Sequence, residues 1–143
     1  MWLKKVAALL AGAAVFSPAV CGAATLIMQI EGIRSPQGRL HYAVYDRVEN
    51  FPTRKGRVAT GEPDVTGSRL TIRVPGLKPG RYAVAVFHDE NGNDEFDQGF
   101  LGIPLEDYAF SNNATGFLSA PSFEDAAFSV NEPETGIVIR MTD

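Results

Sequence analysis

The stretch LKPGRYAVAVF, residues 77–87, is the part of the sequence that decides the fold. Its Pro79-Gly80 pair favours a tight turn. The run Tyr82–Phe87 that follows is apolar on both faces, which is typical of a strand in the middle of a sheet. A tyrosine just inside such a strand can hydrogen-bond back to the turn, as in the tyrosine corner of Greek-key sandwiches. The stretch therefore predicts a turn followed by a central strand.

Short runs of alternating apolar and polar residues lie on either side of this strand, separated by Gly, Pro, Asn and Asp. No segment of helical length has a 3.6-residue period. We therefore expect an all-β protein, a single immunoglobulin-like or transthyretin-like antiparallel β-sandwich of about seven strands. Long connections are expected over 46–68 and 88–122. The recognisable strands are Thr25–Ile33, Arg39–Tyr45, Arg69–Val74, Tyr82–Phe87, Ala126–Val130 and Gly136–Met141.

The N-terminus has the three parts of a secretory signal peptide. Lys4 and Lys5 are followed by the uncharged run Val6–Val20 and by small residues at 22–24. We expect a signal peptide over residues 1–23, a domain over 24–143, and a periplasmic or secreted protein. The alternatives are an N-terminal helix packed on the domain and lipidation at Cys21, although Val20 is a poor residue to precede a lipidated cysteine.

Loss of this signal changes the charge and the available chemistry. The chain has 13 basic and 17 acidic residues; the signal holds two lysines and no acid, so 11 and 17 remain, a net charge of −6. The single cysteine leaves with the signal, which excludes disulfides, cysteine-based zinc sites and cysteine nucleophiles. A net charge of −6 disfavours nucleic-acid binding. Residues 82–139 contain eleven acids and no Lys or Arg.

The acidic segment HDENGNDEFD, residues 88–97, is the most specific chemical feature. Its oxygen-bearing residues have the spacing of positions 1, 3, 5, 7 and 9 of a calcium loop, with position 7 contributing its backbone carbonyl. The loop departs from an EF-hand at position 6, which is Asp94, and at position 12, which is Phe100. Glu106 or Asp107 could complete it. The candidate Ca²⁺ ligands are Asp89, Asn91, Asn93, Glu95 and Asp97.

A loop of this kind can also form without metal. Asn-Gly favours a hairpin turn, and Asp and Asn side chains close Asx turns on their own backbone. Both interpretations remain open from the sequence.

Four motifs together resemble the DUF2141 family of exported bacterial proteins. They are YAVAVFHDEN at 82–91, GIP at 102–104, FSNN at 110–113 and PSFEDA at 121–126. The resemblance covers roughly residues 26–142 and implies export, bacterial origin and one β domain. It carries no activity. The family's loop often has Gly where this chain has Asp94.

Other candidate residues lie outside the acidic loop. The basic cluster of Arg54, Lys55 and Arg57 could contact an anionic surface. His88 is expected at a strand end, bonded to a carboxylate or carbonyl, and His41 is expected to be structural. The apolar residues of 100–123 either tuck the long connection onto the sandwich or form a recognition surface.

The sequence therefore favours a non-catalytic exported binding or structural module, with Ca²⁺ as a candidate ligand that would order its acidic loop. One alternative is a small periplasmic enzyme using the loop carboxylates and His88. The other is an interaction protein that contacts an anionic cell-envelope surface through the 54–57 loop. The expected partner is an unidentified protein or envelope component, with no nucleic acid and no transmembrane segment in the mature chain.

Overall fold

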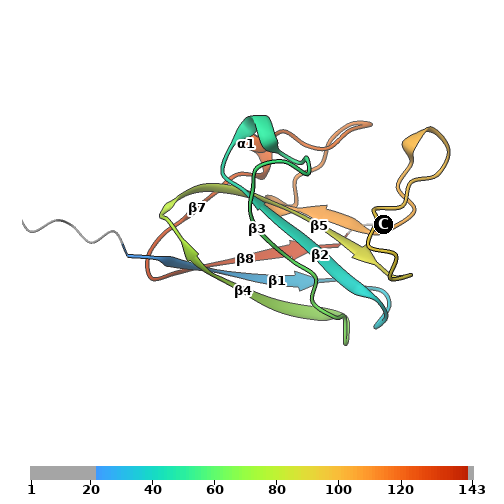
Figure 1. Ribbon diagram of the computed structural model, residues 1–143, viewed down its shortest axis with the longest axis horizontal. Helices are drawn as coiled ribbons and strands as arrows, with labels where there is room; N and C mark the ends of the chain where they lie inside the picture. The colour runs from blue at the N-terminus through green and yellow to red at the C-terminus, as the bar shows by residue number, and fades with distance from the viewer. Residues whose placement is uncertain (1–21, 142–143) are drawn as a thin grey trace, which may run out of the picture.

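A computed structural model describes residues 22–141, which form two packed sheets (Figure 1). The first sheet has the order β4-β1-β8, and the second has the order β3-β2-β5-β6, with β7 also paired to β5. The all-β sandwich-like fold is thus confirmed, with eight strands in the described residues against about seven expected. The strands are β1 Ala24–Glu31, β2 Arg39–Tyr45, β3 Arg57–Gly61, β4 Arg69–Leu77, β5 Gly80–Asp89, β6 Tyr108–Phe110, β7 Phe128–Val130 and β8 Glu134–Arg140.

Three features differ from the sequence-based expectation. β3 and β6 lie inside the two long connections, where their short length hides any alternation. The strand expected over 126–130 begins later, because Ser122 caps a one-turn helix, α1 Phe123–Ala126, by accepting the N–H of Asp125 at 3.1 Å. β1 and β8 pair in parallel, a departure from the antiparallel pattern. Short 3₁₀ turns are η1 Val48–Asn50, η2 Phe100–Gly102 and η3 Ser111–Asn113.

The core lies between the sheets and follows from the alternation of β1. Ala24, Leu26, Met28 and Ile30 are all fully buried. Burial of each large aliphatic side chain stabilises the fold by roughly 1.5–3 kcal/mol. The predicted tyrosine corner is present, since Tyr82 Oη donates to the Lys78 carbonyl at 2.7 Å.

A second set of apolar residues covers the outer face of the second sheet, where α1 and the segment after η1 pack. Aromatic rings contact one another in sequence across this face, with centroid separations from 4.6 to 6.0 Å. We call this set the aromatic row: His41, Phe87, Phe96, Tyr108, Phe110, Phe51 and Phe123. The row begins at His41, which lies beside Asp89 of the acidic loop, and ends at Phe51 and Phe123. Phe51 lies just before the 54–57 loop.

The signal peptide predicted over 1–23 lies almost entirely in residues 1–21, outside the described part of the chain. Among residues 22–141, no helix has the length and hydropathy needed to cross a membrane.

Candidate functional site

The acidic loop starts at Asp89, the last residue of β5, whose side chain is fully buried. Its Oδ1 accepts the backbone N–H groups of Gly92 at 2.7 Å and Asn93 at 3.1 Å, and its Oδ2 accepts that of Asp94 at 2.8 Å. Burial alone raises the pKa of Asp89, but these three donors and His41 hold it below its ordinary value. Asp89 is therefore the ionised anchor of the loop.

The amide side chains of the loop converge on Asp97. Asn91 Nδ2 donates to Asp97 Oδ2 at 2.7 Å, and Asn93 Nδ2 lies 2.9 and 3.0 Å from the two Asp97 oxygens. The amide oxygens close Asx turns, Asn91 Oδ1 on the N–H of Asn93 and Asn93 Oδ1 on that of Glu95, both at 3.0 Å. The exposed Glu95 joins the loop through its backbone. The structure thus brings three of the five predicted side chains together around one point.

Asp94 occupies the position at which an EF-hand has glycine. Its φ is +62°, in the left-handed region that glycine adopts most readily, and Asp is among the residues that tolerate it. The presence of Asp94 in place of glycine is therefore compatible with the tight turn.

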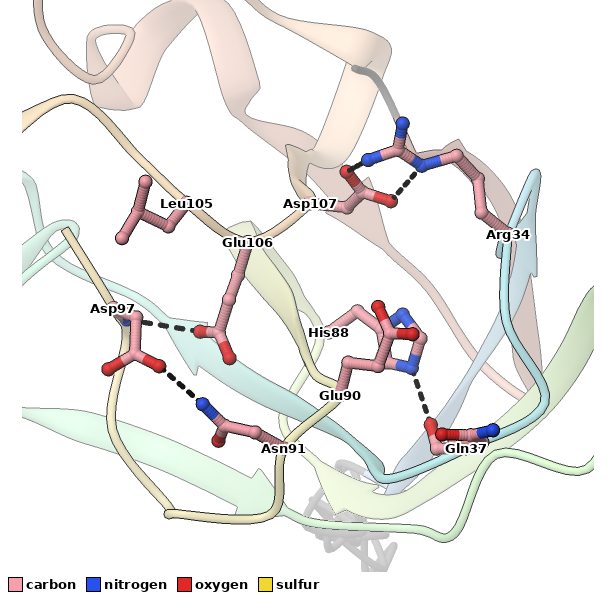
Figure 2. Close-up of a pocket in the computed structure, with 9 residues that line it drawn as sticks. All are labelled: Arg34, Gln37, His88, Glu90, Asn91, Asp97, Leu105, Glu106 and Asp107. Atoms are coloured by element: carbon pink, nitrogen blue, oxygen red, sulfur yellow. Dashed lines mark hydrogen bonds and ion pairs between the residues drawn. The ribbon is translucent and has the colours of Figure 1, made fainter. Parts of the chain in front are cut away.

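Glu106 follows the 98–104 segment, and its side chain points towards Asp97 and Asn91 of the acidic loop, as Figure 2 shows. Its Oε2 accepts the N–H of Asp97 at 3.1 Å, whereas its Oε1 is buried without a hydrogen-bond partner among the described residues. Burial raises the pKa of Glu106, and the charges of Asp97 and Asp89 raise it further, outweighing the bond from Asp97. A buried unsatisfied carboxylate oxygen is rare enough in a native fold to need an explanation, such as an unseen ion.

A cavity of about 480 Å³ opens beside this carboxylate. Arg34 closes one side by donating from Nε to Asp107 Oδ2 at 2.7 Å and from a terminal nitrogen to Oδ1 (Figure 2). Asp107 is therefore paired with arginine, which leaves Glu106 as the acid facing the loop. The lining residues are Arg34, Gln37, His88, Glu90, Asn91, Asp97, Leu105, Glu106 and Asp107.

His88 is buried at the end of β5, and its Nε2 lies 2.7 Å from the Gln37 carbonyl. This is the strand-end hydrogen bond expected from the sequence. His88 and Asp89 are neighbours on a strand and point to opposite faces of the sheet.

His41 has a role that sequence reasoning missed. It stacks on Phe87 at 4.6 Å, and its Nε2 lies 3.3 Å from Asp89 Oδ2 and 3.6 Å from Asp94 Oδ1. These three groups could meet at a metal ion. However, Arg39 approaches Asp94 at 3.6 Å, so a cation already occupies this side of the cluster. The cross-strand register, which places His41 opposite Phe87, is the signal that would have revealed it.

The basic residues Arg54 and Lys55 are exposed in the loop before β3, and Arg57 is exposed as the first residue of β3. Arg57 Nε donates to the Thr53 carbonyl at 3.2 Å, which orders the base of this loop.

Comparisons with curated proteins and with solved structures gave no match. A family model described as "Uncharacterized protein conserved in bacteria (DUF2141)" matches residues 28–138, which include most of both sheets and the whole acidic loop. The chain therefore belongs to the DUF2141 family.

Proposed function

We propose that this chain is an exported, non-catalytic β-sandwich module whose acidic loop binds Ca²⁺. The observation that carries the proposal is the buried, unpartnered Oε1 of Glu106 beside Asp97. Two carboxylates this close repel each other unless a proton or a cation lies between them.

The donor set suits a hard cation. Ca²⁺ takes six to eight oxygens from carboxylates, amide carbonyls, backbone carbonyls and water. Asp97 and Glu106 supply charge, and the amide oxygens of Asn91 and Asn93 each keep a second lone pair beyond the one that closes an Asx turn. The amide NH₂ groups of Asn91 and Asn93 donate hydrogen bonds to Asp97, and a bound Ca²⁺ would replace these donors and balance the charge of Asp97.

Asp89 serves as the anchor of this site. Its oxygens are engaged by three backbone N–H groups, so the loop is preformed before a cation arrives. A preformed loop loses less conformational freedom on binding. Two full carboxylates support an affinity in the range of about 10⁻⁴–10⁻³ M that is typical of extracellular calcium modules. Export, the expectation from residues 1–23, would place the loop where calcium reaches that level.

The enzyme alternative gains no support from the geometry. His88 lines the same cavity as Asp97 and Glu106, but it is buried and its Nε2 is already engaged by the backbone carbonyl of Gln37. A general base needs hydrogen-bond reach to a substrate proton.

Thermal unfolding of the purified protein tests the calcium site. With a dissociation constant of about 1 mM, 10 mM CaCl₂ stabilises the fold by about 1.4 kcal/mol, which raises Tm by roughly 5 °C over EDTA. Glu106→Gln should abolish this rise, and Glu49→Gln, an exposed acid on η1, should keep it. An unchanged Tm in wild type, or an equal rise in Glu106→Gln, refutes the proposal.

A further inference from the structure

Two loops display apolar side chains that the fold does not use. Phe100 and Leu101 are each 84% exposed, and Phe117 and Leu118 are 89% and 93% exposed. Large apolar side chains this exposed, gathered in pairs, mark an interaction site. The sequence left open that the apolar residues of 100–123 pack on the sandwich. These four side chains do not pack on it.

The two loops have the same local sequence, Gly-Phe-Leu-x-x-Pro, at 99–104 and 116–121. In both, the leucine lies in the left-handed region, with φ of +61° at Leu101 and +55° at Leu118. A bulky residue rarely adopts this conformation. Both loops are also closed tightly, by a bond from Gly99 N–H to the Ile103 carbonyl at 2.7 Å and by a Gly116 on which a Cβ would overlap the Ser119 carbonyl.

The bases of the loops are anchored to the aromatic row. Phe96, just before the first loop, packs on Tyr108 at 5.9 Å, and Tyr108 and Gly116 line one small cavity. Both loops therefore rise from the same part of the second sheet, and Figure 1 shows them on the same side of the molecule. The Phe-Leu pairs form two protrusions on a fixed base.

Charge identifies the surface that these protrusions fit. Residues 98–105 and 112–123 carry no charged residue. The basic cluster of Arg54, Lys55 and Arg57 follows Phe51, whose ring packs at 6.0 Å on Phe123, two residues after the second loop. Two uncharged apolar tips, with cations near the second of them, are complementary to a lipid surface, which offers apolar chains beneath anionic headgroups.

We propose that this side of the sandwich docks on an anionic phospholipid bilayer. Phe100, Leu101, Phe117 and Leu118 enter the boundary between headgroups and acyl chains, and the basic cluster contacts the headgroups. The protein lies on the membrane without spanning it. The docking is independent of the calcium proposal, because none of its residues belongs to the acidic loop.

Co-sedimentation with vesicles of phosphatidylglycerol and phosphatidylethanolamine, in EDTA and in 5 mM CaCl₂, tests the docking. We expect wild type to bind and the variant F100S/L101N/F117S/L118N to lose at least about tenfold in partition coefficient. Arg54→Gln and Lys55→Gln should each cost about fivefold, the equivalent of about 1 kcal/mol per basic residue. The control is Val138→Ser, an exposed apolar position on β8 in the other sheet, which should bind as wild type does.

Absence of wild-type binding in both buffers overturns the proposal, as does equal binding by the fourfold variant. Circular dichroism and Tm of each variant establish that it is folded. If sedimentation equilibrium instead gives a wild-type dimer that the fourfold variant dissociates, and no lipid binding occurs, the loops contact a second copy and the membrane proposal is wrong.

Discussion

Glu106 accepts the backbone N–H of Asp97 with one carboxylate oxygen, while the other is buried with no hydrogen-bond partner among residues 22–141. This relationship leaves one oxygen of the carboxylate buried without a donor from the described residues. It also ties together the two ends of the 98–105 segment, because Asp97 precedes that segment and Glu106 follows it.

The first prediction concerns the pH dependence that Glu106 causes. Its folded-state pKa lies above the ordinary value of 4.5, so the folded protein binds this proton more tightly than the unfolded chain. In EDTA the contribution of Glu106 to stability therefore decreases as pH rises from the unfolded-state pKa through the folded-state pKa. Glu106→Gln should raise the free energy of unfolding by about 1 kcal/mol at pH 7 and leave it unchanged below pH 4.

Urea unfolding at several pH values in EDTA measures this effect, with Glu49→Gln as the control. A loss of stability in Glu106→Gln at pH 7 would mean that the carboxylate is satisfied and that the repulsion is absent.

The second prediction concerns Asp89, for which the sign is opposite. Its folded-state pKa is lowered, so its stabilising contribution is present above the unfolded-state pKa and is lost as pH falls through the folded-state value. Asp89→Asn leaves one acceptor oxygen for three N–H donors and should cost about 3 kcal/mol at pH 7. The difference from wild type should narrow towards pH 2 in denaturant titrations, and the exposed Asp46→Asn should have little effect.

The third prediction concerns Ser111, which fills a gap in the second sheet. β7 pairs with residues 80–82 of β5 and β6 with 85–87, so Val84 lies between them. The buried Ser111 Oγ accepts the Val84 N–H at 2.9 Å and donates to the Ala126 carbonyl at 2.5 Å. Ser111→Ala should cost about 2–3 kcal/mol in urea unfolding because it leaves both groups unpaired. Ser119→Ala, at an exposed serine, should be neutral; equal effects would contradict this role.

The fourth prediction separates function from stability in the apolar loops. Asn tolerates the left-handed region better than Leu, so Leu101→Asn and Leu118→Asn should each stabilise the fold by about 0.5–1 kcal/mol. Differential scanning calorimetry should show a higher Tm in the variants that lose vesicle binding. A lower Tm would mean that these leucines contribute to packing.

The sequence was sufficient to predict the sandwich because its information is local: the alternation of β1 and the turn before Tyr82 both lie within a few residues. It could not reveal β6, since a three-residue strand is defined only by its partner β5. The acidic loop was predicted with its side chains, yet the role of His41 depended on cross-strand register, 48 residues away from Asp89. The exposure of Phe100, Leu101, Phe117 and Leu118 could not be predicted from composition. An apolar loop that packs on the sandwich and one that projects from it can contain the same residue types.

The parallel pairing of β1 with β8 has a consequence for how the chain comes to be folded. β1 lies between β4 and β8, so the first sheet is incomplete until residues 134–140 are available. Contacts between such distant segments form slowly. A ribosome or a secretion channel would therefore release nearly the whole chain before this sheet could close. Such late closure would keep the chain unfolded during passage through a channel, which is compatible with the export that we propose.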